Sequence, residues 1–247
     1  AVLNADGTVS FTPALNFNGP ASLSYTLTDG AAVSAAVAVS VDVQAVNDSP
    51  VAAPDALSAI EDTPVTFSAA QLLGNDADVD GNVLRIASVT PGGGGSVLLN
   101  ADGSVTFTPS LHFNGPANFS YVASDGMALS AAASVVVNVA PVNDAPVALP
   151  ETLAASEDTT VVYRAEQLLG NDQDVEASAL TIASVTSGSA GSAVLNADGT
   201  VSFTPDANFN GNATFSYVAS DGSSSSNSAS VSVTVTPVND APVASNN

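Results

Sequence analysis

The stretch Asn100-Ala-Asp-Gly-Ser-Val-Thr-Phe-Thr-Pro109 decides the fold of this chain. It opens with four polar or small residues, of which Asn, Asp and Gly tolerate positive φ, and it continues as a run of β-branched and aromatic residues. Apolar residues stand on both sides of the polar tetrapeptide, at 97–99 and 105–108. A turn of this chemistry between two such runs is typical of a β-hairpin. The stretch therefore predicts two antiparallel strands joined by a tight turn.

A stretch that differs from it at only two positions occurs twice more, and the shared tetrapeptide begins at Asn4, Asn100 and Asn196, so the period is 96 residues. Other motifs keep this period: Phe-Thr-Pro at Phe11, Phe107 and Phe203, Phe-Asn-Gly at Phe17, Phe113 and Phe209, Val-Asn-Asp at Val46, Val142 and Val238, Glu-Asp-Thr at Glu61 and Glu157, and Leu-Leu-Gly-Asn-Asp at Leu72 and Leu168. A domain-sized period without insertions predicts one folded module copied in series.

A proline follows each Val-Asn-Asp, at Pro50, Pro146 and Pro242, and marks the joints because it cannot donate a ladder hydrogen bond. We therefore expect complete repeats at 49–144 and 145–240, the second half of a repeat at 1–48, and the start of the next linker at 241–247. The half repeat, and the opening directly on a strand pattern, suggest a fragment of a longer protein.

Seven short strands are predicted within each complete repeat. In the first they cover residues 52–59, 65–69, 83–90, 97–99, 105–108, 119–123 and 134–140. Strands of this length and spacing predict an all-β fold, a seven-stranded immunoglobulin-like β-sandwich, with the repeats arranged end to end. No segment shows a sustained helical period.

The charge balance excludes several function classes. Two basic residues, Arg85 and Arg164, stand against 24 acidic ones, and the formal net charge is −22. Nucleic-acid binding and attraction to anionic membranes both need clustered Lys and Arg, so neither is expected. No apolar run of about 18 residues occurs, and the chain has no cysteine for disulfides or thiolate metal sites.

The acidic residues gather at the two ends of each predicted sandwich when its strands alternate in direction. In the first complete repeat one end carries Asp76, Asp78, Asp80, Asp102 and Asp125, and the other carries Glu61, Asp62, Asn143 and Asp144. In the second the corresponding residues are Asp172, Asp174, Glu176, Asp198 and Asp221, and Glu157, Asp158 and Asp240. Only Asp55 is expected away from both ends of its repeat.

Stacked repeats would bring opposite ends together and crowd carboxylates at each joint. Without a counterion such crowding costs several kcal/mol, and the chain has almost no Lys or Arg to offset it. Ca²⁺ takes about six to eight oxygen ligands in flexible geometry and fits better than Mg²⁺. The predicted calcium ligands are Asn47, Asp48, Asp76, Asp78, Asp80, Asp125, Glu61, Asp62, Asn143, Asp144, Asp172, Asp174, Asp221, Glu157, Asp158, Asn239 and Asp240.

Several features have a plain structural explanation. The Asn-Asp-rich loops could be solvated turns, and turn chemistry alone accounts for Asp102 and Asp198. His112 is the single histidine, and the other copies have Asn16 and Asn208 at its position, so a Ser-His-Asp triad is not expected. The carboxylate pairs could suit glycoside hydrolysis, but no Trp offers a sugar platform. The chain is therefore not predicted to be an enzyme.

The combination of Val-Asn-Asp-Ala-Pro-Val-Ala, Glu-Asp-Thr, Leu-Leu-Gly-Asn-Asp-x-Asp-Val and Phe-Asn-Gly with Ser-Asp-Gly resembles bacterial cadherin-like tandem repeats. Such repeats occur in large repeats-in-toxin and biofilm-associated surface adhesins, and the resemblance covers essentially the whole chain. It implies an extracellular, cell-surface location and calcium at the joints. It also implies linker ligands at Asn143 and Asp144, paired aspartates at Asp172 and Asp174, and further ligands at Glu61 and Asp221. Glu176 departs from the pattern. It stands where the previous repeat has Asp80, the third Asp of the run.

Three functions follow from these observations. A repeated module with nearly unchanged loops favours a calcium-stiffened stalk, whose partners are the neighbouring repeats of the same chain. A carbohydrate- or protein-binding module would need divergent loops or exposed aromatic residues. A subunit that assembles with other copies of itself into a fibre is motivated by the open edge of residues 1–48.

Overall fold

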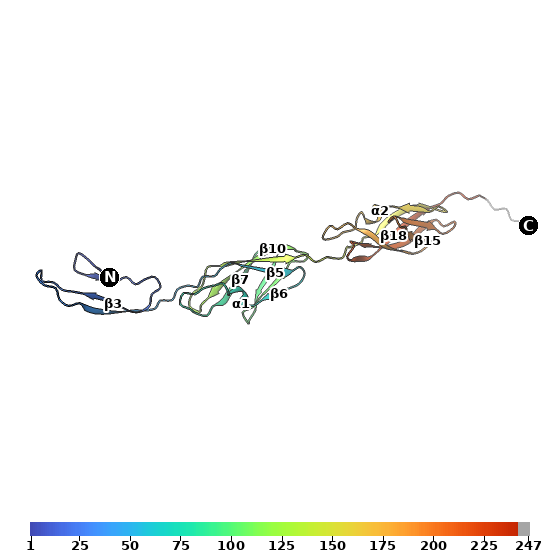
Figure 1. Cartoon of the computed structure of the whole chain (residues 1–247). Coiled ribbons are helices and arrows are strands. Elements are labelled where there is room, and N and C mark those ends of the chain that lie inside the picture. The colour runs from blue at the N-terminus through green and yellow to red at the C-terminus, as the bar shows by residue number, and fades with distance from the viewer. Residues whose placement is uncertain (242–247) are drawn as a thin grey trace, which may run out of the picture. The chain divides into compact units, whose positions relative to one another are not determined.

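The computed structural model describes residues 1–241 and divides into two compact units between Pro141 and Val142. The first unit holds the half repeat and the first complete repeat, and the second unit holds the second complete repeat (Figure 1). None of the helices within residues 1–241 is long and apolar enough to cross a membrane.

The first complete repeat is a sandwich of a four-stranded and a three-stranded sheet. The first sheet has the order β5-β11-β10-β7, with β5 at Asp55–Ile60, β11 at Ala133–Ala140, β10 at Gly115–Ser124 and β7 at Arg85–Pro91. The second has the order β6-β9-β8, with β6 at Val65–Phe67, β9 at Val105–Pro109 and β8 at Gly95–Leu99. All seven predicted strands are confirmed, and the all-β sandwich fold with them.

The second complete repeat has the same two sheets. One has the order β12-β18-β17-β14, with β12 at Glu151–Ser156, β18 at Ser225–Thr236, β17 at Gly211–Ser220 and β14 at Thr181–Ser187. The other has the order β13-β16-β15, with β13 at Val161–Tyr163, β16 at Val201–Pro205 and β15 at Gly191–Leu195. The 96-residue period of the sequence is thus a period of the structure.

Each repeat closes by a parallel pairing of its first and last strands. β5 pairs with β11 from Asp55 opposite Val135 to Ile60 opposite Ala140, and β12 pairs with β18 in the same way. The other strand pairs of the two sandwiches are antiparallel. The chain therefore enters a repeat at one end of the sandwich and leaves it at the other.

The core follows the two-residue period of the strands. Alternate residues of β11 are buried, and Val135 and Val137 are fully shielded. The rings of Phe107 and Phe119 stack with centroids 6.2 Å apart. The buried cluster of the first complete repeat draws only on residues 52–139, so that repeat has a core of its own.

Two short helices interrupt the strands, where the sequence predicted none. They are α1 at Ala69–Leu72 and α2 at Ala165–Leu169 (Figure 1). Ser68 caps α1, since its hydroxyl accepts a hydrogen bond from the Gln71 N–H while the Gln71 side chain accepts one from the Ser68 N–H. One turn of helix is too short to show a 3.6-residue period, but the Ser-x-x-Gln capping box was a readable signal. Leu72 is fully buried, so α1 adds a side chain to the core.

The half repeat contains the last strands of a repeat without the first ones. Here β1 (Val2–Leu3) pairs with β2 (Val9–Ser10), and β3 (Gly19–Tyr25) pairs with β4 (Val37–Val43). These four strands correspond, in order, to β8, β9, β10 and β11 of the first complete repeat.

Candidate metal centre

The first linker is hydrogen-bonded to the loops at the entry end of the following repeat. The Asn47 side-chain amide donates to Asp125 Oδ2 at 2.7 Å, and Asn82 donates to Asn47 Oδ1 at 3.1 Å. The backbone N–H of Asp48 donates to Asp80 Oδ2 at 2.7 Å. The structure thus places the predicted ligands of this linker beside those of the Asp76–Asp80 loop and of the turn at Asp125.

The second linker repeats the contacts of its Asn side chain with the turn acid and of its Asp N–H with the loop acid. Asn143 donates to Asp221 Oδ2 at 2.7 Å and to Ser224 Oγ at 3.1 Å. The Asp144 N–H donates to Glu176 Oε2 at 3.3 Å. Glu176 therefore takes the place that Asp80 has in the previous repeat, and the departure from the sequence pattern preserves the contact.

The loop aspartates between these contacts carry buried oxygens without a hydrogen-bond partner in the described part of the chain. Asp78 Oδ1 accepts from the Asn82 N–H at 3.1 Å, and Asp174 Oδ1 accepts from the Ser178 N–H at 2.7 Å. The second oxygen, Oδ2, is buried and unpartnered in both residues, and so is Glu176 Oε1. A buried carboxylate oxygen without a donor is costly. A bound cation would satisfy these atoms, so the residues fit a calcium site.

Asp76 and Asp172, the first aspartates of the two loops, are held by the protein itself. The Tyr121 hydroxyl donates to the Asp76 carboxylate, at 2.9 and 3.0 Å from its two oxygens, and the Ala53 N–H donates to Asp76 Oδ1 at 2.8 Å. Tyr217 lies 2.8 and 3.0 Å from the two oxygens of Asp172. These two aspartates therefore anchor the loop to the core, and their predicted role as ligands stays a prediction.

Asp55 lies beside this anchor and not, as predicted, away from the ends of the repeat. Asn75 donates to its Oδ1 at 3.2 Å. Burial and the nearby Asp76 charge raise the pKa of Asp55. In the second complete repeat burial and Asp172 likewise raise the pKa of Glu151. The sequence prediction missed both residues because β5 and β12 begin at the entry end, so their first side chains lie beside the acidic loop.

The turn between β10 and β11 holds Asp125 as an anion. Its Oδ1 accepts from the backbone N–H groups of Met127 and Ala128, each at 2.6 Å. The pKa of Asp125 is lowered by three hydrogen-bond donors. The Ala128 N–H has the largest effect, followed by the Asn47 side-chain amide and the Met127 N–H. The same kinds of donor lower the pKa of Asp221. Both side chains are thus ready-made anionic ligands beside the linker.

The exit end of the second complete repeat forms a separate carboxylate group. Oxygens of Glu157, Asp158 and Asp240 lie within 4.8 Å of one another. Glu157 is only 3% exposed, and it accepts from the Val238 N–H at 2.8 Å and from the Asn210 amide at 3.1 Å. Three acidic groups at this distance favour a shared cation.

The exit end of the first complete repeat is built in the same way. Glu61 is 1% exposed and accepts from the Asn114 amide at 3.4 Å. Asp62 Oδ1 accepts from the His112 N–H at 2.8 Å, and Asp62 Oδ2 lies 3.5 Å from His112 Nδ1. The convergence of Glu61 and Asp62 with the acids of the following repeat stays a prediction. The sequence predicted Phe-Asn-Gly as a tight turn beside the joint but not the contact of its Asn with this glutamate, although the spacing of the two motifs is the same in both repeats.

Each linker has the same local conformation. The side-chain amides of Asn47 and Asn143 donate to the carbonyl of the next aspartate at 3.0 Å, and that of Asn239 does so at 3.2 Å. This local hydrogen bond is thus common to the three Val-Asn-Asp segments.

Asp102 and Asp198 are turn residues. Asp102 Oδ1 accepts from the backbone and the hydroxyl of Ser104 at 3.0 and 2.7 Å, and Asp198 makes the same contacts with Thr200. The structural explanation given by the sequence is thus sufficient for both.

We expect Tyr217→Phe to destabilise the second complete repeat by about 1–3 kcal/mol, because the Leu168 carbonyl and Asp172 would lose a buried donor. Urea unfolding monitored by circular dichroism in chelator measures this effect as a shift of the midpoint at constant slope. Tyr163→Phe is the matched control, since that hydroxyl has a single acceptor, the Ala154 carbonyl at 3.0 Å. An equal loss in both variants would contradict the anchoring role of Tyr217.

Solved structures similar to this chain include cadherin ectodomains. Human mucin-like protocadherin EC1-2 aligns at a TM-score of 0.44 with 19% identity, covering 76% of this chain and 98% of that one. Protocadherin gamma B2 domains 1–5 align at 0.44 with 16% identity, covering 92% and 47%. The endo-fucoidan hydrolase MfFcnA4 of glycoside hydrolase family 107 aligns at 0.31 with 18% identity, covering 92% of this chain and 35% of that one. At these scores none of the likenesses bears on function, and this chain spans about a third of the hydrolase.

No curated protein matches the sequence. The profile of the cadherin-like domain family matches residues 1–44, 46–140 and 142–236. These three matches repeat the period of the sequence and cover nearly all of it. The chain therefore belongs to the cadherin-like domain family.

Proposed function

We propose that this chain is a calcium-rigidified extender segment of a large extracellular adhesin, of the kind found on bacterial surfaces and in biofilms. Its tandem cadherin-like repeats supply length, and calcium at the joints supplies stiffness. The observation that carries the proposal is the buried, unpartnered Oδ2 of Asp78 and its counterpart in Asp174, each next to a linker already bound to the same repeat.

The ligand set of each entry end follows from these contacts. Asp78 or Asp174 contributes its free oxygen, and the turn acid Asp125 or Asp221 contributes a carboxylate with a lowered pKa. The linker residues and the loop acids Asp80 and Glu176 complete the set. The exit-end pairs Glu61–Asp62 and Glu157–Asp158 are proposed as further calcium ligands. Carboxylate and carbonyl oxygens in this number suit Ca²⁺.

Calcium titration of the full chain by calorimetry tests the proposal. We expect dissociation constants of about 10⁻⁴–10⁻³ M, the range of extracellular modules. The double variant Asp78→Asn with Asp174→Asn should lose most of the heat, because it removes the charge of the two loop aspartates whose Oδ2 atoms are buried without a partner.

The matched control is Asp102→Asn with Asp198→Asn, which changes the same total charge in the hairpin turns. This control should titrate like the unchanged chain. Absence of binding heat, or equal losses in the two double variants, would reject the calcium site.

A further inference from the structure

The metal centres at the entry ends of the two complete repeats are built alike but are not identical. Each has a linker asparagine bonded to the turn acid and a linker N–H bonded to the third acid of the loop. Three differences in sequence bear on how a cation would be held. The first centre has Asp80, Asn82 and Arg85 where the second has Glu176, Ser178 and Thr181.

The first difference adds a buried oxygen to the second centre. Among the loop acids of the first centre, Asp78 alone has a buried oxygen without a hydrogen-bond partner within residues 1–241, whereas in the second both Asp174 and Glu176 have one. Asp55 Oδ2 is also unpartnered, but it lies on β5 beside Asn75, outside the linker contacts. A buried carboxylate oxygen without a donor is costly, so the second centre is stabilised more by a bound cation.

The second difference concerns the linker asparagine. In the first centre the Asn82 side-chain amide donates to Asn47 Oδ1 at 3.1 Å, so this oxygen already has a donor. In the second centre Ser178 replaces Asn82, and no hydrogen bond to Asn143 Oδ1 is formed within residues 1–241. A cation at the first centre must therefore share the Asn47 oxygen with an N–H group, whose partial positive charge opposes it.

The third difference is a positive charge. Arg85 opens β7 opposite Ser124, and its guanidinium lies beside the following turn, because a Cβ added at Gly126 would come within 3.1 Å of its Nη2. In the second repeat Thr181 takes this place, and a Cβ at Gly222 would meet no atom within 4 Å. Each of these glycines directly follows the turn acid of its centre. Salt screens charges over about 10 Å at 0.1 M ionic strength, so a guanidinium this close weakens the attraction of the first centre for a cation.

We propose that the two centres are unequal, and that the centre at Asn143 binds calcium about tenfold more tightly than the centre at Asn47. The charge and number of the ligands tune calcium sites over such ranges, and the three differences act in the same direction. The inference rests on the proposed function, since it concerns the same two sites. As calcium falls, the linker at Asn47 loses its ion first, so the chain loosens one joint at a time.

A calcium titration of the full chain, followed by heteronuclear NMR of its backbone amides, tests the inequality. Gly126 and Gly222 report the two centres separately, because each N–H lies in the turn of its own centre and donates to a serine there, Ser124 or Ser220, at 3.0 Å. We expect the Gly222 signal to reach its midpoint at about one tenth of the calcium concentration that Gly126 needs.

The double variant Arg85→Thr with Asn82→Ser gives the first centre two residues of the second. It should lower the calcium midpoint of Gly126 severalfold and leave that of Gly222 unchanged. Arg164→Thr is the matched control, because it removes the same charge from the other complete repeat. This control should leave the Gly126 midpoint where it is in the unchanged chain.

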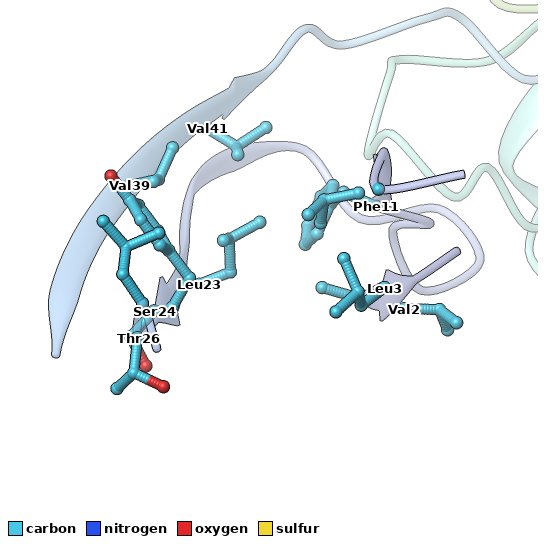
Figure 2. A pocket seen from close by; sticks show the side chains of 13 residues that line it. Val2, Leu3, Phe11, Leu23, Ser24, Thr26, Val39 and Val41 are labelled. Carbon is cyan, nitrogen blue, oxygen red and sulfur yellow. The ribbon is translucent and has the colours of Figure 1, made fainter. Parts of the chain in front are cut away.

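The half repeat supplies an internal reference for the titration. Its apolar cleft of about 890 Å³ is lined by no acidic side chain, and Figure 2 shows Leu3 and Phe11 on one side of it and Leu23 and Val39 on the other. The amide signals of these residues should keep their positions throughout. They thus separate binding at the centres from a general effect of calcium on a chain of net charge −22.

Equal midpoints for Gly126 and Gly222, or a lower one for Gly126, would overturn the inequality and leave the proposed function standing. An unchanged Gly126 midpoint in the double variant would overturn it too, since Arg85 and Asn82 would not be its cause. Absence of any shift at both glycines would instead reject calcium binding, and with it the proposed function. Spectra in chelator show whether the double variant is folded. Should it not fold, Thr181→Arg makes the reverse test, and a Gly222 midpoint that this variant does not raise would equally overturn the proposal.

Discussion

Saturating calcium should raise the melting temperature of the full chain by roughly 10–20 °C relative to chelator. A ligand that binds only the folded state adds about 2.7 kcal/mol at a hundred times its dissociation constant. For a domain of the size of one repeat, each kcal/mol of added stability raises the melting temperature by about 4–8 °C. A large effect is expected because the buried, unpartnered Oδ2 atoms of Asp78 and Asp174 would gain a cation. Differential scanning calorimetry at neutral pH measures it.

The same experiment has a predicted pH dependence. The folded-state pKa values of Asp125 and Asp221 are lowered, so their stabilising contribution is present above about pH 4 and is lost as the pH falls through those lowered values. Calcium ligands must also be ionised. The difference between calcium and chelator should therefore close below about pH 4. An unchanged melting temperature in chelator at neutral pH would reject structural calcium.

Calcium should also change the mechanics of the joints. Without metal the linker carboxylates repel one another, and salt screens only part of this repulsion. In the proposed function, ligands from the repeats and the linker would share a cation, so a rotation of one repeat against the next would break several bonds together. Small-angle scattering of the full chain should therefore show a longer maximum dimension and a narrower distribution of distances in calcium than in chelator.

A matched control separates this effect from general screening of charge. The Asp78→Asn with Asp174→Asn variant should give the chelator curve in both conditions, whereas Asp102→Asn with Asp198→Asn should respond to calcium like the unchanged chain. Identical curves for the unchanged chain with and without calcium would refute the stalk mechanism and leave the acidic ends without explanation.

The strands were predictable because their signals are local. The turn residues at Asn100–Gly103 indicate the hairpin directly, and Gly103 has the positive φ that such a turn needs. The alternation along β11 is complete. The helix α1 was missed because a single turn carries too few residues for periodicity, and tertiary burial of Leu72 stabilises it.

The proximity of each linker to the acidic loop and turn was predictable, whereas the internal contacts of these loops were not. Counting acids toward the ends of alternating strands placed the linkers beside the loops, since that step needs only topology. It could not show that Tyr121 holds Asp76 or that Asn114 holds Glu61, because these pairs depend on side chains 45 and 53 residues apart. It also misplaced Asp55, whose neighbourhood is decided by the residue at which β5 begins.

The parallel pairing of first and last strands has a consequence under tension. A pull on the two ends of a repeat draws β5 and β11 along each other in opposite directions, so their hydrogen bonds from Asp55–Val135 to Ile60–Ala140 bear the load together in shear. Bonds loaded together must fail together, whereas a ladder peeled from one end fails bond by bond. The two strands that connect a repeat to the rest of the chain are thus the ones whose hydrogen bonds oppose its extension.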